Sequence, residues 1–368
     1  MKKRFVFISN MASPHQVRFC NHLQKYFETE FWFYEHIGKT RPQWWKIELP
    51  PSCKVIGHLL YKRRERYVTF EVIKMLRRYN PDIIMLGSVC APSNFLAYLW
   101  ARKHGKKVIM LVETFRKNGK LREKSIWTKL IDLMYRQIDA IFAVHDTAAE
   151  QMRSLLPHIG KLTHVAPYAS DIDRYFEHPL RIKKAGYIYI FPNRLIDIYN
   201  PLLAIEIFAE IHAMYPQSIL RINSEGQLLN DCRTLIRRLG IADSVQFLTE
   251  IKHWDDLSSI YKDSDILLFP AKFSNGNFTI FECMASGMGI IISNKILSQA
   301  SIIKDGENGF VREPDKVQFL DAVQQYIAHP ELFIKHATIN REIVRPYSAV
   351  ETAKLYAKVI NEKVLHNS

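Results

Sequence analysis

The sequence has no apolar run long enough to cross a membrane and no secretory signal at its start. Among its 368 residues, the longest apolar runs, such as 108–112, have the length of β-strands, whereas a spanning helix needs roughly 20 apolar residues. The basic residues at 2–4 precede only four apolar residues, fewer than the roughly 7–15 of a signal peptide. We therefore expect a cytoplasmic protein whose first apolar run is a strand.

Cysteine patterns typical of disulfide scaffolds or zinc sites are also missing. The five cysteines are widely spaced and include no C-x-x-C pair, which indicates a reducing compartment. Short acidic motifs occur at 171–173, 255–256 and 263–265, but none closes a strand in the middle of the first expected sheet, where a metal-binding D-x-D motif would have to lie. We interpret them as helix N-caps and loop acids, and we predict no cofactor and no structural or catalytic metal.

Acidic residues are scarce in the first half only. Residues 1–180 contain 30 Lys and Arg against 16 Asp and Glu, while residues 181–368 contain 21 of each, so the whole net charge of +14 belongs to the first half. Uneven charge speaks to partners rather than to the fold. The first half is expected to meet a membrane leaflet, a phosphorylated acceptor or nucleic acid. Nucleic acid ranks last, because no recognition helix, zinc finger or RNP-like motif is present.

Two basic clusters lie in this half, at 62–66 and 116–124. Charge runs usually form a solvated surface. Aromatic residues lie close to both clusters, namely Tyr61, Tyr67, Phe115 and Trp127. Their combination favours docking on an anionic membrane surface.

Short apolar segments alternate with amphipathic stretches in two separate series. In the first, helices are expected at 92–104 and 126–137, among others, and strands are expected at 5–9, 83–86, 107–112 and 140–144. In the second, strands are expected at 187–191, 219–223, 245–248, 266–269 and 289–293. Such alternation is typical of parallel sheets with helices on both faces. We predict an α/β fold of two doubly wound domains, 1–179 and 180–349, with a C-terminal helix of about 350–368 packing back on the first.

The most informative segment, residues 269–289, reads as a strand, a polar loop and a short helix. Asn277 can cap this helix, and Gly287 can end it in the left-handed conformation. Free N–H groups at the start of a helix bind phosphate, helped by the positive end of the helix dipole. A lone glutamate in a helix is usually solvated, but the neighbours of Glu282 read as mostly buried, which makes it a candidate site residue.

A resemblance to a known family is carried by residues 281–293, which read Phe-Glu-Cys-Met-Ala-Ser-Gly-Met-Gly-Ile-Ile-Ile-Ser. This segment resembles the donor-site signature of the retaining GT-B glycosyltransferases of family 4, in which two glutamates lie eight positions apart and precede A-M-A-x-G-x-P-V-V. Other segments similar to the family's motifs are 167–176, 192–204, 239–248 and 255–270. The resemblance covers the second half nearly throughout, whereas the first half is similar only in layout.

This resemblance implies a GT-B fold, in which two Rossmann-like domains face a central cleft. It also implies a nucleotide diphosphate sugar, linked to UDP or GDP, bound mainly to the second domain. Glu282 matches the glutamate that holds the ribose hydroxyls, and Arg194 matches the arginine that neutralises the departing diphosphate. The segment from Phe247 to Glu250 lies where the base is usually read. A fixed cation aimed at the leaving group stabilises the transition state more than the ground state.

Two departures from the family pattern concern the donor. The first glutamate of the pair is replaced by Ser274, so the sugar is held by this serine, by the asparagines that follow it, or by none of them. The lysine expected five residues after Arg194 is replaced by Tyr199, and Lys272 is a candidate to supply the missing charge. The predicted donor-binding residues are Ser274, Asn275, Gly276, Asn277, Phe278, Thr279, Phe247, Glu250, Lys272 and Tyr199.

Two further departures concern the acceptor side in the first half. The family's glycine-rich turn is replaced by a polar stretch that includes Ser13 and His15. His15 is either an acceptor contact or a residue of the following helix. A histidine that often ends the strand 107–112 is replaced by Glu113, which either contacts or deprotonates the acceptor hydroxyl or caps the next segment. Arg116 completes the predicted acceptor side.

The leading interpretation is a retaining, metal-independent, hexosyltransferase-like enzyme acting on a glycan or lipid-linked acceptor. We expect it to serve cell-surface polysaccharide or lipopolysaccharide biosynthesis as a peripheral protein on the inner face of the cytoplasmic membrane. No nucleophile is evident near the expected sugar position, which favours front-face attack by the acceptor without a covalent intermediate. One alternative is a nucleotide-sugar epimerase, disfavoured by the shortage of acids. Another is a catalytically impaired nucleotide-sugar or glycan-binding GT-B protein, whose donor site is disabled by Ser274 and Tyr199.

Overall fold

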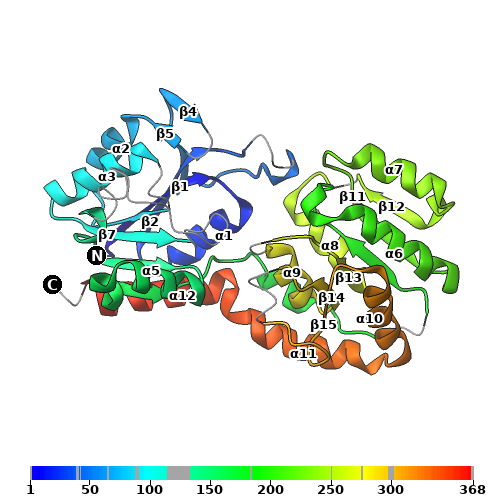
Figure 1. The fold of residues 1–368 in the computed structure, drawn as a ribbon. Helices are drawn as coiled ribbons and strands as arrows, with labels where there is room; N and C mark the ends of the chain where they lie inside the picture. Colours follow the sequence, from blue (N-terminus) through cyan, green and yellow to red (C-terminus); the bar gives the residue numbers. More distant parts are fainter. Residues whose placement is uncertain are drawn as a thin grey trace. The chain divides into compact units, whose positions relative to one another are not determined.

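The computed structural model describes residues 2–38, 41, 43–63, 66–87, 91–113, 133–182, 185–249, 251–274, 277–296 and 302–365. Contacts divide the chain into two compact units, both drawn in Figure 1. The first unit consists of Met1–Ala169 and Ala349–Ser368, and the second of Ser170–Ser348. The second unit therefore interrupts the first in the sequence, and the junction follows residue 169 where the sequence suggested residue 179.

A seven-stranded sheet forms the centre of the first unit. Its strand order is β3-β2-β1-β6-β7-β8-β9, and every neighbouring pair is parallel. The strands are β1 (Arg4–Met11), β2 (Glu28–Glu35), β3 (Cys53–Val55), β6 (Ile83–Leu86), β7 (Lys107–Val112), β8 (Ala140–Ala143) and β9 (Thr163–Val165). β6 and β8 are buried along their whole length, as expected of a parallel sheet covered on both faces.

Helices cover both faces of this sheet. One hydrophobic cluster joins the sheet to α2 (Glu71–Tyr79), α3 (Pro92–Lys103) and α5 (Asp146–Leu155). The cluster on the other face joins it to α1 (Pro14–Leu23) and α12 (Ala349–Val359). Alternation along β1 explains the division, since Val6 belongs to the first cluster and Phe7 to the second.

The last helix of the chain belongs to the first unit, as Figure 1 shows for α12. Tyr356 is 2% exposed, and its ring lies edge-on to Phe19 at 4.9 Å and to Phe142 at 4.8 Å. The helix continues into a π-helical turn at Ile360–Leu365. Among the described residues, no helix is both long and apolar enough to span a bilayer.

A short antiparallel hairpin of β4 (Tyr61–Arg63) and β5 (Arg66–Val68) lies outside the main sheet (Figure 1). It contains part of the first basic cluster. The second basic cluster, with Arg116, and most of the helix expected at 126–137 fall outside the described residues.

The second unit contains a six-stranded sheet in the order β12-β11-β10-β13-β14-β15, again parallel throughout. Its strands are β10 (Ile188–Phe191), β11 (Ile219–Asn223), β12 (Val245–Leu248), β13 (Ile266–Phe269), β14 (Gly289–Ser293) and β15 (Phe310–Arg312). Its α-helices are α6 (Pro201–Met214), α7 (Leu229–Arg238), α8 (Leu257–Lys262), α9 (Phe278–Ser286), α10 (Lys316–Ala328) and α11 (Glu331–Val344). The predicted α/β class and doubly wound sheets are confirmed.

Candidate functional site

The strand order of the second sheet reverses between β10 and β13. From β10 the chain proceeds to β11 and β12 on one side, and from β13 to β14 and β15 on the other. Ligands of open α/β sheets bind at such a switch point, outside the carboxyl ends of the strands. The loops that leave β10 and β13, residues 192–200 and 270–277, are therefore the first place to look for a ligand site.

These two loops are joined by hydrogen bonds. The Lys272 backbone N–H donates to the Ile198 carbonyl oxygen at 2.9 Å. The Asn277 side chain donates from Nδ2 to Asn193 Oδ1 at 2.6 Å. Since Asn193 is only 5% exposed, its position is fixed, and it ties the end of β10 to the start of α9.

Helix α9 has both predicted caps. Asn277 is extended, with φ of −147°, and its Oδ1 accepts the Thr279 backbone N–H at 2.9 Å. Gly287 ends the helix at φ +86°. The helix thus starts at Phe278 beside the switch point, with its positive dipole end at the carboxyl edge of the sheet. Asn275 and Gly276, predicted to bind the donor, lie outside the described residues.

Arg194 lies in the loop after β10 and is half-buried. Burial raises the pKa of the Glu225 carboxyl, and the nearby Arg194 guanidinium opposes this. The Leu195 N–H donates to the Glu225 carbonyl oxygen at 2.8 Å, which holds the Arg194 loop against the turn after β11. Gly226 makes this contact possible, because at φ +143° a Cβ atom would lie 2.3 Å from the Leu195 carbonyl oxygen.

Lys272 and Tyr199 meet at the same loop. Lys272 Nζ forms an ion pair with Asp197 at 2.6 Å, and the two side chains are 50% and 73% exposed. Asp197 opens the 3₁₀ helix η4 (Asp197–Tyr199). Tyr199 packs its ring against Phe269 at 5.5 Å. The ammonium group of Lys272 is therefore held beside the segment where the resemblance expects a lysine.

Glu282 points into the second unit and is 3% exposed. The Tyr261 hydroxyl donates to its carboxylate at 2.8 Å. Burial raises the pKa of Glu282 to about 7, although the hydrogen bond from Tyr261 and the charge of Arg174 lower it. Glu282 is therefore not a solvated helix residue. Tyr261, which lies in the segment 255–270 that resembles the family, orients its carboxylate.

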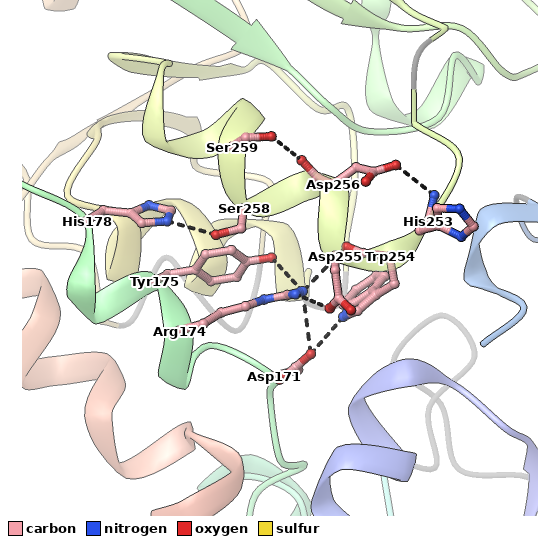
Figure 2. Close-up of polar contacts among 10 residues, drawn as sticks. All are labelled: Asp171, Arg174, Tyr175, His178, His253, Trp254, Asp255, Asp256, Ser258 and Ser259. Carbon is pink, nitrogen blue, oxygen red and sulfur yellow. Dashed lines mark hydrogen bonds and ion pairs between the residues drawn. The ribbon is translucent and has the colours of Figure 1, made fainter. Parts of the chain in front are cut away.

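A polar cluster beneath α9 is drawn in Figure 2. The Trp254 indole N–H donates to Asp171 Oδ2 at 2.7 Å. Arg174 forms ion pairs with Asp171, at 3.5 Å, and with Asp255. Arg174 belongs to the 3₁₀ helix η3 (Asp173–Glu177), and Trp254 and Asp255 to η6 (Trp254–Asp256). Asp171 lies in a loop and Asp255 in the first turn of η6, as expected of loop and capping acids, and both also hold this arginine.

Other acids of the same motifs do serve the backbone. Asp256 Oδ2 accepts the N–H groups of Lys252 and His253, and these bonds lower the pKa of Asp256. Asp265 Oδ2 accepts the Ile188 N–H at 2.8 Å. Among the described residues, no group of three or more His, Cys, Asp or Glu side chains is arranged to hold a metal ion.

His178 and Arg341 fix the far end of α9. Arg341 donates to the carbonyl oxygens of His178 at 2.6 Å and Ala285 at 2.9 Å. His178 Nε2 lies 3.0 Å from Ser258 Oγ (Figure 2). Burial, with the positive charges of Arg341 and Lys262, lowers the pKa of His178 to about 4, so its ring is neutral at pH 7.

Phe247, expected near the base, lies in β12 and is half-buried. The Arg233 guanidinium lies 5.5 Å from the centre of its ring. Ser224 donates from its hydroxyl to the Leu248 carbonyl oxygen at 2.9 Å, which links the carboxyl ends of β11 and β12. Glu250 lies outside the described residues.

The residues predicted for the acceptor side lie in the first unit. Ser13 caps α1, accepting the Gln16 N–H at 3.3 Å. His15 is 2% exposed within α1 and lies edge-on to Trp45 at 6.2 Å, so of its two interpretations the helix residue fits the structure.

Glu113 directly follows β7 and is exposed. The Tyr168 hydroxyl donates to Glu113 Oε1 at 2.6 Å. His145, after β8, is close enough for the Glu113 charge to oppose the lowering of the His145 pKa by burial. Sequence reasoning missed Tyr168 and His145, because 55 and 32 residues separate them from Glu113 and no local pattern joins the three.

Comparisons with known proteins show which family and which fold the chain resembles. Residues 174–358, which are 185 of the 368, match the family described as Glycosyl transferases group 1. The chain is 24% identical over 323 residues to the Escherichia coli UDP-Gal:alpha-D-GlcNAc-diphosphoundecaprenol alpha-1,3-galactosyltransferase, covering 82% of this chain and 80% of that protein. It is 27% identical over 134 residues to an uncharacterized glycosyltransferase of Haemophilus influenzae, covering 36% of this chain and only 37% of that relative.

Solved structures are similar along the whole chain. A glycosyltransferase from Rickettsia africae superposes with a TM-score of 0.73 at 15% identity, covering 100% of both chains. HepE of Anabaena, solved in complex with UDP, superposes with a TM-score of 0.70 at 13% identity, covering 98% of this chain and 100% of that one. At these identities the likeness concerns the fold.

Proposed function

Because this chain belongs to the Glycosyl transferases group 1 family and has a GT-B fold with two Rossmann-like sheets, we propose that it moves a sugar from a nucleotide diphosphate sugar to an acceptor hydroxyl. The observation that carries the proposal is the presence of two basic side chains and a helix N-terminus at the switch point of the second sheet. Arg194, Lys272 and the N-terminus of α9 lie on the loops that leave β10 and β13. A departing nucleoside diphosphate requires such an environment.

Each group has a part in the proposed transfer. Arg194 neutralises the diphosphate as its bond to the sugar breaks, and the turn at Gly226 holds the Arg194 loop in place. Lys272 supplies the second cation in place of the lysine that Tyr199 replaces. The first N–H groups of α9 receive phosphate oxygens. Because these groups are fixed before reaction, they stabilise the charge that grows on the leaving group.

Glu282 is proposed to receive the ribose hydroxyls, which requires the nucleotide to reach a side chain that is only 3% exposed. Tyr261 orients its carboxylate, and a carboxylate accepts two adjacent hydroxyls well. UDP is the favoured nucleotide, since the Anabaena structure contains UDP and the E. coli relative is named for a UDP-galactose donor. The sugar itself lies near Ser274, which is 5% exposed.

We assign the acceptor to the first unit, at Glu113 and its partner Tyr168. The acceptor class proposed is a lipid-linked glycan of surface polysaccharide synthesis, supported by the E. coli relative, whose name gives a diphosphoundecaprenol acceptor. Transfer is proposed to retain configuration by front-face attack. It is also proposed to need no metal, because Arg194, Lys272 and α9 already supply positive charge at the diphosphate, so chelator should leave the rate unchanged.

Binding of UDP, GDP, ADP and dTDP, measured by thermal shift, tests the donor site. A nucleotide present at 100 times its Kd stabilises the fold by about 2.7 kcal/mol. We expect UDP to raise the melting temperature of the wild type but not that of Arg194→Ala or Glu282→Ala. A wild type that no nucleotide stabilises would contradict the donor site.

A second candidate function is a nucleotide-sugar or glycan-binding protein without transferase activity. It is favoured by Ser274 in the position of an acid and by Tyr199, whose ring packs on Phe269 instead of presenting a cation. Tight UDP binding without release of UDP from UDP-sugars, in the presence of lipid-linked acceptors, would support it over the transferase.

A further inference from the structure

Three of the exposed large apolar side chains of the first unit lie close together in the sequence. Leu60 is 66% exposed, Tyr61 47% and Phe70 60%, and all three lie within eleven consecutive residues. A single exposed apolar residue needs no explanation, but a group of them marks a surface that meets another apolar phase.

The pairing of the β4–β5 hairpin fixes which way Tyr61 faces. Tyr61 lies opposite Val68, and Lys62 lies opposite Tyr67. The Tyr67 hydroxyl donates to Glu35 Oε1 at 2.7 Å, and Lys62 forms an ion pair with the same carboxylate. Since neighbouring residues of a strand point to opposite faces, the face with Lys62 and Tyr67 packs on the unit, and the face with Tyr61 points away from it.

Helix α2 continues this surface. Phe70 precedes the helix as its N-cap, and Lys74 and Arg77 follow at intervals of four and three residues, which places the three on one face. Both basic residues are exposed, whereas Val72 and Leu76 are buried. Thr69, between Val68 and Phe70, is fully buried. The hairpin–helix surface is defined by Leu60, Tyr61, Arg66, Phe70, Lys74 and Arg77.

Its charge is positive among the described residues, because Glu35 and Glu71 are each matched by one lysine while Arg66 and Arg77 remain in excess. Glu35 pairs with Lys62, and Glu71 pairs with Lys74 at 3.1 Å. The residues of the first unit include 32 Lys and Arg against 15 Asp and Glu, whereas those of the second include 19 against 22. The net charges are therefore +17 and −3, and only the first unit complements an anionic partner.

We infer that the hairpin–helix surface docks on an anionic phospholipid leaflet. Leu60, Tyr61 and Phe70 enter the interfacial layer, while Arg66, Lys74 and Arg77 meet the headgroup phosphates. The inference deepens the proposed function and rests on it, because a lipid-linked acceptor lies at a membrane. Docking itself requires neither donor nor transfer.

Co-sedimentation of the full chain with vesicles tests the inference. The vesicles contain phosphatidylcholine alone or mixed with phosphatidylglycerol, at low and high salt. The wild type is expected to bind only the anionic vesicles and to dissociate from them at high salt. Arg66→Glu with Arg77→Glu weakens binding roughly 30-fold, the effect of losing two basic residues at an anionic leaflet. Leu60→Ser with Phe70→Ser weakens it roughly tenfold.

Matched controls come from the second unit. Arg237 and Arg238 are exposed and lie in the last turn of α7, as Arg77 does in α2, and Val317 is 71% exposed. The double variant of Arg237 and Arg238 to Glu and the variant Val317→Ser should bind vesicles like the wild type. Equal loss in test and control variants, or no vesicle binding by the wild type, would overturn the inference.

Two further measurements separate the possible failures. The wild type could instead self-associate and fail to bind vesicles. If Leu60→Ser with Phe70→Ser then abolished self-association, the surface would be assigned to a second copy of the chain and lipid docking would be overturned. The thermal shift by UDP reports on the donor site alone. A surface variant that loses vesicle binding but keeps the UDP shift supports the inference. Absence of the UDP shift in the wild type contradicts the donor site, and the vesicle measurements then decide on lipid docking alone.

Discussion

Glu282 illustrates at the residue scale how burial changes an acid. In the unfolded chain its carboxyl ionises near the ordinary value of 4.5, and in the fold its pKa is about 7. Between these values the folded protein holds a proton that the unfolded chain has lost. Stability should therefore fall as pH rises from 4.5 to 7.

The size of this effect is about 3 kcal/mol, since one pKa unit corresponds to about 1.4 kcal/mol. Glu282→Gln, which cannot ionise, should remove that part of the pH dependence. Tyr261→Phe should steepen it, because the hydrogen bond from Tyr261 lowers the pKa of Glu282. Thermal unfolding of the three proteins at pH 5 and pH 8 measures both effects, and parallel profiles for wild type and Glu282→Gln would disprove the assignment.

Lys272 is expected to act on the diphosphate rather than on the fold. Its ion pair with Asp197 is exposed, and exposed pairs contribute little to stability. Lys272→Ala should weaken nucleotide binding about tenfold with little change in melting temperature. Calorimetric titration with UDP measures the loss.

Two variants separate this role from a structural one. Asp197→Ala breaks the same ion pair but leaves the lysine free to meet phosphate, so it should bind UDP at least as well as the wild type. Lys316→Ala removes a lysine of similar exposure, paired with Glu210, and should have no effect. Equal losses in Lys272→Ala and Asp197→Ala would mean that only the ion pair matters.

Local rules predicted single residues well where the cause is local. The caps of α9 follow from Asn277 and Gly287 themselves, and the burial of Glu282 follows from its apolar neighbours. The partners of these residues could not be predicted, since Asn193 is 84 residues from Asn277 and Arg341 reaches Ala285 from 56 residues away. Such pairs exist only once the sheet has formed.

At the scale of elements, the strands were predictable because parallel strands buried on both faces are continuous apolar runs. All nine expected strands are present. The eight-residue strand β2 was missed, since its apolar residues are flanked by glutamates at both ends. The three-residue strands β3, β9 and β15 were also not predicted, because so short a segment shows no periodicity. They are identified only by their pairing with a longer neighbour.

The contact between the β10 and β11 loops gives a prediction at this scale. Gly226→Ala would place a Cβ atom 2.3 Å from the Leu195 carbonyl oxygen and force the Arg194 loop away from the turn. The expected cost is at least about 2 kcal/mol, together with loss of the UDP thermal shift.

Gly240→Ala provides the control, since this glycine also has a positive φ of +69°, but a Cβ atom added there would meet open space. It should cost only about 1 kcal/mol and keep the UDP shift. If both variants lost the same stability and the same UDP shift, the positive φ would explain the loss in Gly226→Ala, and the close approach to Leu195 would not.

At the scale of the whole molecule, α12 provides the test of the two units. Tyr356→Ala removes a ring packed between Phe19 and Phe142 and should destabilise the first unit by about 3–5 kcal/mol. Tyr356→Phe keeps the ring and should cost about 1 kcal/mol. Limited proteolysis with and without UDP measures both, and protection of the second unit by UDP should persist in the alanine variant.

The order of the units along the chain has a consequence for synthesis. Residues 170–348 form the second unit without a contribution from the ends of the chain, so a ribosome releases everything it needs before α12 emerges. The first unit, although translated first, waits for that last helix to cover one face of its sheet. Domains fold as units during translation, and in this chain the second unit is complete before the first. Until α12 emerges, the face of the first sheet that this helix covers is exposed, and it is the surface that a chaperone would have to protect.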